Sequence, residues 1–463
     1  MMIRISPYLL PLLLAGCVVG PDYVPPSAPT PAVYKELQGW TPARPSDDID
    51  RGAWWSVYQD PLLDELERQI DIGNQNLRAY EAAYRSARAV VDEARANYFP
   101  TVSASGSGQR QRTSSLIASS KSVQASASWD LDLWGKVRRQ VESDQSAAEA
   151  SAAELASIRL SAQGELATYY FELRYQDSLA RLLTETVDAY QRSLSITRNQ
   201  YTAGVASRSD VITAETQLKS TQASLIVTGV LRAQYEHAIA ILIGKPPAEL
   251  TISAGSLTAA VPDVPVQLPA TLLQRRPDIA QAERTMQQEN ALIGVKTAAY
   301  YPDISLSADF GYSSATTALF KTSKQIWSLA ASGSETLFDA GARGAAVEQA
   351  EATYDQAVAN YRQTVLTAFQ DVEDGLSGLR VLSDQAKMQA EAVAAAREAQ
   401  RIALNEYKAG TANYTTVVTA QATALTNEQT ALQIQQNLMT TSVSLIKALG
   451  GGWSVDSLRE AAR

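Results

Sequence analysis

Side chains that carry out chemistry are scarce in this sequence of 463 residues, which contains one Cys and one His. A single His is too few for a multi-His metal site, and it makes a Ser–His mechanism a poor fit. Cys17 alone forms neither an intrachain disulfide nor a multi-Cys zinc site. His237 lies in a helical context, and Gly244-Lys245 is followed by Pro246, so it forms no phosphate-binding loop. We therefore expect no enzyme activity, no catalytic residue and no metal.

Cys17 instead ends a segment whose chemistry is lipidation. After a basic start, residues 8–15 form an apolar stretch too short to span a bilayer. Leu14-Ala15-Gly16-Cys17 resembles the lipobox of bacterial lipoprotein signals. In that pattern residues 1–16 are removed as a signal peptide and the Cys17 thiol carries diacylglycerol, the only cofactor-like group we expect. Val18 follows where Asp would indicate inner-membrane retention, so we expect sorting to the outer membrane. The alternative is an ordinary secretory signal with an incidental Cys.

Charge and composition restrict the partners. The chain has 40 Lys+Arg against 49 Asp+Glu, a net charge of −9, which argues against a nucleic-acid or anionic-lipid partner. Residues 20–45 contain seven Pro and read as an extended tether.

No run of 18 apolar residues follows Cys17, so we expect no transmembrane helix. A chain that spans the outer membrane without one must use strands in a closed barrel.

The chain is internally duplicated. Tyr98-Phe99-Pro100 recurs as Tyr300-Tyr301-Pro302, and Tyr201-Thr202-Ala203-Gly204 recurs as Tyr407-Lys408-Ala409-Gly410. The matching segments are separated by nearly the same number of residues along the chain, which indicates two copies of a unit of about 200 residues.

Four segments alternate apolar and small polar residues, most clearly the second and third: 102–106, 123–133, 304–312 and 327–331. Surface loops are expected between them, at 109–121 and 314–325. A barrel wall between lipid and water requires this alternation. A half-buried sheet in a soluble domain fits it equally well, and the lipidation motif favours the membrane.

Four strands cannot close a barrel, because the smallest membrane barrels have about eight. The free edges must therefore pair with other copies of the chain. Two copies would supply eight strands and three would supply twelve, so this reasoning requires a homo-oligomer without fixing its order.

The helical segments are unusually long. Residues 136–203 and 345–409 lack Pro and predict helices of about 100 Å at ~1.5 Å per residue. Shorter helices before the strands should stack end to end on helices that return from the Ala-Gly turns: 62–98 on 205–243, and 278–301 on 411–449. The helices are rich in Ala, which is typical of the wall of a hollow tube.

These features resemble the TolC-like outer-membrane efflux factors, specifically the lipoprotein branch that serves resistance-nodulation-division (RND) pumps. Trp54-Trp55, the segment Leu272–Ile279 and both Tyr-x-Ala-Gly turns carry the resemblance, which covers residues 17–453. It implies a mostly α fold with a membrane β-barrel: a trimer with a twelve-stranded barrel, a periplasmic α-helical tunnel and a mixed equatorial region. It also implies an exit duct that passes small molecules such as drugs out of a Gram-negative bacterium.

The implied partners are a homotrimer, a periplasmic adaptor (membrane fusion) protein, an inner-membrane RND transporter and outer-membrane lipid, with no nucleic acid. The expected division of the chain is a signal peptide (1–16), an anchor with tether and the start of the equatorial region (17–61), two repeats (62–257 and 258–452) and a tail (453–463). Arg276-Pro277-Asp278 is expected as a structural signature, because Pro suits the first turn of a helix and Asp favours its positive end.

The resemblance places the two Ala-Gly turns, about 201–210 and 407–416, at the periplasmic tip. Candidate adaptor contacts are Tyr201, Gly204, Val205, Ser207, Tyr407, Gly410, Thr411 and Asn413. Candidate gate residues are Arg208, Asp210, Tyr414 and Thr419. Some family members carry an acid at the position of Thr419, so the neutral residue puts a gate centred on the second repeat in doubt.

Two other functions fit part of the pattern. An exit duct for type I protein secretion shares the fold, and the lipobox and the Arg-Pro-Asp signature favour the small-molecule branch. A structural coiled-coil lipoprotein accounts for the helices but leaves the alternating strands unexplained.

Overall fold

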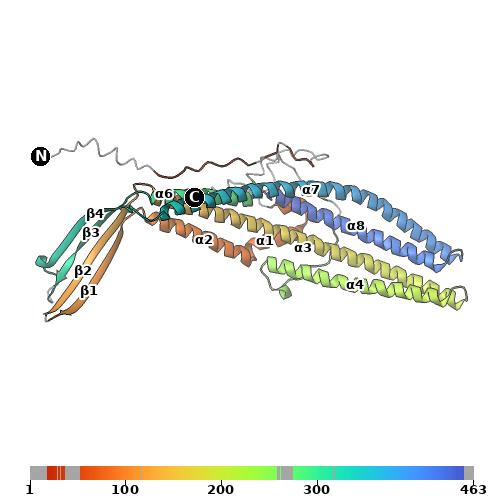
Figure 1. Cartoon of the computed structure of the whole chain (residues 1–463). Helices are drawn as coiled ribbons and strands as arrows, with labels where there is room; N and C mark the ends of the chain where they lie inside the picture. The colour runs from red at the N-terminus through yellow and green to blue at the C-terminus, as the bar shows by residue number, and fades with distance from the viewer. Residues whose placement is uncertain are drawn as a thin grey trace.

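The chain forms an elongated molecule with a β-sheet at one end and two helical hairpins at the other (Figure 1). The computed structural model describes residues 18–28, 30–31, 33–36, 53–114, 116–257, 261, 275–315 and 319–452. The expected signal peptide, Cys17, residues 272–274 of the signature and the tail from 453 lie outside these ranges.

Two helical hairpins of equal size make up most of the length. The helix α3 (Lys136–Thr202) and the helix α7 (Ala342–Lys408) each have 67 residues. They turn back into α4 (Arg208–Leu242) and α8 (Tyr414–Ala448), each of 35 residues. At ~1.5 Å per residue the long helices extend about 100 Å. The two halves of the chain therefore fold alike, as the repeated motifs predicted.

The shorter helices are α1 (Pro61–Gly73), α2 (Gln75–Ala96) and α6 (Pro277–Ala298). Our expectation of one helix over 62–98 is wrong, because Asn74 interrupts it. Asn74 is extended (φ −63°, ψ 114°), and its side-chain oxygen accepts a hydrogen bond from Leu77 N at 2.9 Å, which caps α2. Short 3₁₀ helices complete the set: η1 (Trp54–Tyr58), η2 (Pro247–Glu249) and η3 (Thr322–Lys324).

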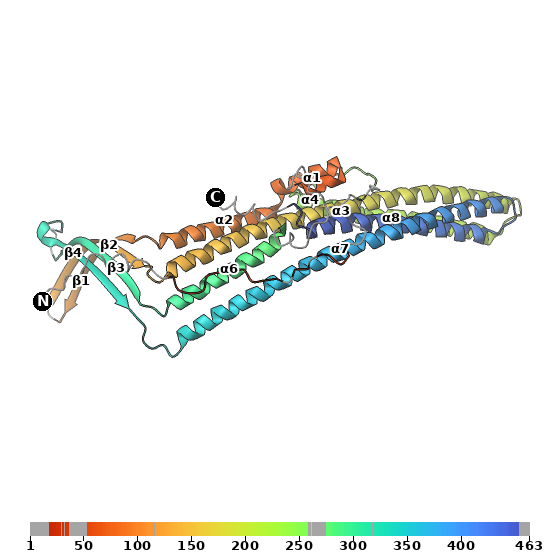
Figure 2. The same ribbon diagram turned by 90° about the horizontal axis from the view of Figure 1, so that it is seen from above.

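The short helices continue the columns of the returning helices, as expected. Asn74 Nδ2 at the start of α2 donates to Leu242 O at the end of α4 (2.8 Å). In the second half Arg276 Nη1, before α6, donates to Ala448 O at the end of α8 (3.3 Å). Figure 2 shows α2, α3, α6 and α7 side by side, and neighbouring members of this series are in contact. Each repeat thus pairs one continuous helix with one jointed column.

The sheet contains four antiparallel strands in the order β1 (Thr101–Thr113), β2 (Leu116–Leu131), β3 (Asp303–Ser314) and β4 (Gln325–Ser334). The prediction of four strands is confirmed. The expected loop at 109–121 is wrong: β1 and β2 stay paired up to Thr113↔Leu116. Polar residues there hide the alternation, but backbone hydrogen bonds still extend the ladder to a turn where Ser114 has φ +55°.

The register gives the sheet one apolar and one polar face. Trp129 pairs with Leu306, and Phe310 pairs with Trp327, on the same face as Val102. On the other face Asp309 accepts hydrogen bonds from Ser126 (2.6 Å) and Ser328 (2.9 Å). Such a sheet has the surface pattern of a barrel wall with lipid outside and water inside.

One described helix, α4, is long and apolar enough to cross a membrane when judged by length and composition alone, with a mean hydropathy of 1.2 over its best 18 residues. Our expectation of no transmembrane helix came from the lack of an uninterrupted run of 18 apolar residues, whereas α4 meets a looser criterion of average hydropathy. Only 17% of that window is buried, and α4 lies along α3 for its length. A single segment of this kind is weak support for a membrane-spanning helix.

The larger core clusters lie in the middle of the molecule. Trp54, Tyr58 and Leu63 pack against Tyr170 and Phe171 of α3. Around this level the described part of residues 18–36, which we call the strap, runs back along the helices toward the sheet (Figure 2). At its far end Val19 N donates to Trp134 O (3.0 Å), at the junction of sheet and helices.

Candidate functional site

The helical tip consists of two turns with the same backbone design. Gly204 and Gly410 end α3 and α7 with φ of +77° and +76°. Val205 N donates to Gln200 O (2.8 Å), and Thr411 N donates to Glu406 O (2.9 Å). These bonds satisfy the last carbonyls of each long helix in the manner of a Schellman motif, which needs a left-handed residue and therefore favours Gly.

Side-chain caps then start the returning helices. Ser207 Oγ accepts a hydrogen bond from Asp210 N (3.1 Å), and Asp210 Oδ2 accepts one from Ser207 N (3.0 Å), which completes a capping box. In the second turn Asn413 Oδ1 accepts from Thr416 N (3.1 Å). The first turn therefore carries a carboxylate that the second lacks.

Near the tip, two tyrosines of the second hairpin, Tyr407 of α7 and Tyr414 of α8, pack against α3 of the first. Tyr407 and Tyr414 pack edge to face with ring centroids 5.2 Å apart. Their cluster includes Tyr190 and Leu194 of α3, and Tyr414 lies 3.4 Å from the Ser193 hydroxyl, oxygen to oxygen. Burial raises the pKa of Tyr407 and of Tyr414, and the charge of Asp210 adds to both shifts. The charge of Asp210, in the first hairpin, therefore influences two tyrosines of the second hairpin.

The candidate contact residues differ in their exposure and in their local roles. Tyr201 (47% exposed) and Val205 (70% exposed) face solvent, as do Gly204, Gly410 and Thr411. Tyr407 is 5% exposed, so in this arrangement it presents no surface to a partner, although it occupies the position equivalent to Tyr201. The exposed Ser207 and Asn413 have capping roles of their own. Sequence equivalence of the two turns does not reveal this asymmetry.

The four gate candidates do not form one cluster. Arg208 is exposed and forms no ion pair with the described residues, whereas Asp210 is used in the capping box. Tyr414 is buried in the contact between the hairpins. Thr419 is exposed and donates to Thr415 O one turn earlier (3.0 Å).

The signature residues Arg276, Pro277 and Asp278 lie where α6 continues the column of α8. Arg276 donates two hydrogen bonds to the Asp278 carboxylate, at 3.0 and 2.7 Å, and a third to Asp371 of α7 (2.9 Å). Its bond to Ala448 O caps the end of α8. Pro277 occupies the first turn of α6, and Asp278 lies at its positive end. Arg276 therefore fastens α6, α7 and α8 together.

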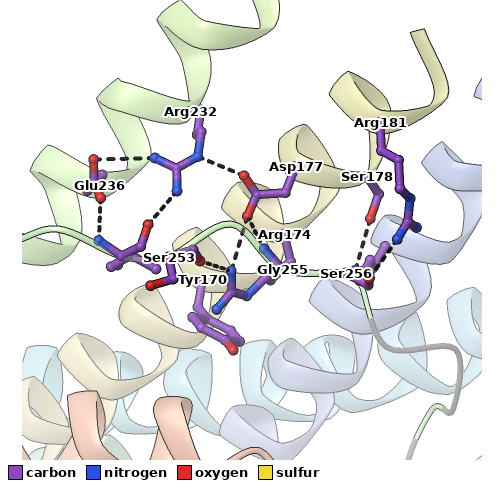
Figure 3. Close-up of polar contacts among 12 residues, drawn as sticks. Tyr170, Arg174, Asp177, Ser178, Arg181, Arg232, Glu236, Ser253, Gly255 and Ser256 are labelled. Carbon is purple, nitrogen blue, oxygen red and sulfur yellow. Dashed lines mark hydrogen bonds and ion pairs between the residues drawn. The ribbon is translucent and has the colours of Figure 1, made fainter. Parts of the chain in front are cut away.

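A polar network that the sequence did not predict fastens the first half at a similar level (Figure 3). Asp177 of α3 accepts hydrogen bonds from Arg174 (3.1 Å), from Arg232 of α4 (2.7 Å) and from Gly255 N (3.0 Å). Arg232 also donates to Ile252 O. The network binds the segment after η2 to both helices of the hairpin. The only sequence signal was the spacing of Arg174 and Asp177, three residues apart on one helix face.

Asp177→Ala is expected to destabilise the protein by about 3 kcal/mol, because the buried Arg174 loses its carboxylate partner and Arg232 keeps only the longer pair with Glu236 (3.4 Å). Thermal unfolding of the purified protein measures the change. Asp384→Ala is the matched control, since Asp384 and Lys387 are exposed and their pair contributes little. Equal melting temperatures for wild type and Asp177→Ala would contradict this role of the network.

The strap is held at both ends. Arg139 of α3 donates to Val19 O (3.3 Å) and to Asp22 (2.7 Å), and Asn290 of α6 donates to Pro21 O (3.0 Å). At the other end the Glu373 carboxylate accepts hydrogen bonds from Lys35 N and Glu36 N, at 2.7 and 2.9 Å. Val19, two residues after Cys17, is therefore fixed beside the base of the sheet.

Comparison with known proteins identifies this architecture. A family model described as outer membrane efflux protein matches residues 67–245 and 268–451. The solvent efflux pump outer membrane protein SrpC of Pseudomonas putida is 33% identical, with 96% of this chain and 97% of that protein covered. The cation efflux system protein CusC of Escherichia coli is 27% identical, with 97% and 99% covered.

Among solved structures, the outer-membrane channel OprN superposes with a TM-score of 0.89 at 30% identity, over 94% of this chain and 100% of that chain. The family model matches both halves of the chain, and a relative above 30% identity aligns with nearly all of it. The chain therefore belongs to the outer membrane efflux protein family, the TolC-like channels of efflux systems.

Proposed function

We propose that this protein is the outer-membrane exit duct of a tripartite RND-type efflux system in a Gram-negative bacterium. The observation that carries the proposal is the full-length match to efflux-pump outer membrane proteins in a chain that joins a four-stranded sheet to helices of 67 residues. A sheet at one end and a helical tip about 100 Å away suit a duct that crosses a membrane and extends into the periplasm.

The proposed assembly is a homotrimer, which the free edges of the sheet support without fixing the number of copies. Within the chain, β1 and β4 each pair with one described neighbour, so both have a free edge. Three copies joined at these edges make a twelve-stranded barrel. The polar face with Asp309 would then line the lumen, and the apolar face with Trp129 and Phe310 would contact lipid.

The periplasmic adaptor would dock on the exposed tip residues Tyr201, Gly204, Val205, Gly410 and Thr411, and the inner-membrane RND transporter would feed the duct through it. Ser207, Asn413 and Tyr407 would act indirectly, by shaping the turns. The contact between Tyr407 and Tyr414 with Asp210 nearby supports a gate at this level, with the exposed Arg208 as its cation and Thr419 as a neutral residue.

The proposed cargo is small organic molecules such as drugs. The chain is more similar to the solvent efflux protein SrpC, at 33% identity, than to the cation efflux protein CusC, at 27%. Expression with its pump and adaptor in cells that lack their own exit duct should restore dye export. Cells that express the pump and adaptor alone are the control. If cells that express all three proteins still accumulated dye, the proposal would be contradicted.

Cys17 is proposed to carry the lipid. The binding of Val19 to Trp134 supports this, because it holds the chain just after Cys17 at the base of the sheet, where acyl chains reach the inner leaflet. Mass spectrometry of the mature protein should find acylated Cys17 as the first residue. Cys17→Ala should still fold, since the sheet itself anchors the protein. An unmodified Cys17 thiol in the mature protein would contradict lipidation.

A further inference from the structure

Charge is segregated along the sheet. Gly106, Val123, Tyr312 and Gln325 pair in one row across all four strands. The sequence beyond this row, residues 107–122 and 313–324, contains five basic residues and no acid: Arg110, Arg112, Lys121, Lys321 and Lys324. We call the described residues of these two segments, 107–114, 116–122, 313–315 and 319–324, the distal ends. They lie at the opposite extreme of the molecule from the helical tip (Figure 1). The three acids of the sheet, Asp130, Asp303 and Asp309, all lie on the other side of the row.

Three of these cations share one face of the β1–β2 hairpin. Arg110 and Arg112 have the same strand parity as Val102, so they lie on the apolar face. Gly108 pairs with Lys121, and Arg110 pairs with Ser119, which places Lys121 diagonally from Arg110 at about 7–8 Å. All three side chains are exposed. In the part of the chain that the structure describes, none of the five cations forms an ion pair.

The height of these cations matches the edge of a membrane. Ten residues separate Val102 from Arg112 along β1, about 33 Å of strand and roughly 25 Å of height at a tilt of about 40°. The apolar band of an outer-membrane barrel is about 25 Å tall. A long Arg side chain above that band reaches the headgroups of the outer leaflet. Lys324 lies one residue beyond Gln325, and Lys121 lies two residues beyond Val123 of the same row, so these two lysines lie at similar heights.

We propose that the distal ends bind the phosphate groups of the glycolipid in the outer leaflet of the outer membrane. The inference rests on the proposed barrel orientation. An amphipathic ligand suits this surface, because acyl chains can contact the exposed Val123, Phe310 and Trp327 of the same face while phosphates meet the cations above. Arg is well suited to phosphate, since its guanidinium donates two parallel hydrogen bonds. The net charge of −9 led us to expect no anionic-lipid partner, but binding depends on the local charge of the distal ends.

The test measures retention of bisphosphorylated lipid A by the purified full-length protein in detergent, using native mass spectrometry. The triple variant Arg110→Gln, Arg112→Gln, Lys121→Gln should bind it more weakly by a factor on the order of ten or more. The control Arg85→Gln, Arg192→Gln, Arg362→Gln removes equal charge from exposed helical positions and should bind like wild type. Arg110→Lys with Arg112→Lys keeps the charge and should retain most binding.

Dephosphorylated lipid A distinguishes phosphate recognition from hydrophobic contact, and wild type should retain it poorly. Equal retention of bisphosphorylated lipid A by wild type and the triple Gln variant would overturn the proposal. The proposal would also fail if wild type retained the dephosphorylated form as well as the bisphosphorylated form. The unchanged oligomeric mass of each variant, read in the same spectra, excludes misfolding as the cause. Binding is measured without export, so a failed dye-export experiment and a failed lipid experiment remain distinguishable.

Discussion

Gly244→Ala is expected to leave little folded protein in the outer membrane. Gly244 has φ +73°, and a Cβ built on it would lie 1.9 Å from Gly73 O and 2.4 Å from Gly73 C. Both atoms belong to the backbone at the break between α1 and α2, so the clash cannot be relieved by turning a side chain. Backbone strain and overpacking together should cost about 4 kcal/mol or more, a large share of the stability of an ordinary domain.

Outer-membrane abundance by immunoblot and thermal unfolding of the purified protein measure this effect. Gly229→Ala is the matched control on α4, where no atom lies within 4 Å of the added carbon. There the same substitution should stabilise the helix by about 0.5–1 kcal/mol. If Gly244→Ala matched wild type in abundance and melting temperature, the close approach of Gly73 and Gly244 would not be a feature of the folded protein.

Gly204→Val and Gly410→Val are expected to abolish export while the protein reaches the membrane in normal amounts. No atom lies within 4 Å of the carbon that would be added at either position, so the only penalty is the positive φ, about 1–3 kcal/mol for a β-branched residue. The turn can relieve that strain by changing its path, which would displace Val205 and the first turn of α4. The damage should therefore fall on adaptor docking and not on the distant sheet.

Dye export at matched outer-membrane abundance is the measurement. Gly204→Asn and Gly410→Asn are the controls, because Asn tolerates a left-handed backbone and should keep most of the export. Wild-type export by both Val variants would show that these turns are not the site where the adaptor docks.

The sequence predicted the long elements better than the places where they meet. Repeated motifs and Pro-free runs located α3, α4, α7 and α8 to within a few residues, because a long helix has a clear composition signal. The break at Asn74 was missed because Asn74 lies among polar residues, where no helical spacing of apolar residues is present to show an interruption. Its capping hydrogen bond also depends on local backbone geometry. The strand ends around Arg110 were missed because both faces are polar there, and only backbone pairing defines the strand.

The site was predictable only in part for the same reason. The Tyr-x-Ala-Gly motif located both turns, and the two Gly have the expected positive φ. It gave no sign that Tyr407 would be buried and Tyr201 exposed, because that difference comes from packing against Tyr190 and Leu194 of the other hairpin. The Asp177 network joins residues up to 78 apart in sequence, so no local pattern announced it.

The pairing of β2 with β3 has a consequence for how the chain folds. Trp129 meets Leu306, and Lys35 of the strap meets Glu373, 338 residues further along. Such distant contacts give a high contact order, which slows folding because long loops must close before their contacts form. The β1–β2 hairpin is synthesised long before β3, which later covers the edge of β2. During that interval the open edge is prone to aggregation, so this chain should depend on a periplasmic chaperone more than a protein built from local contacts does.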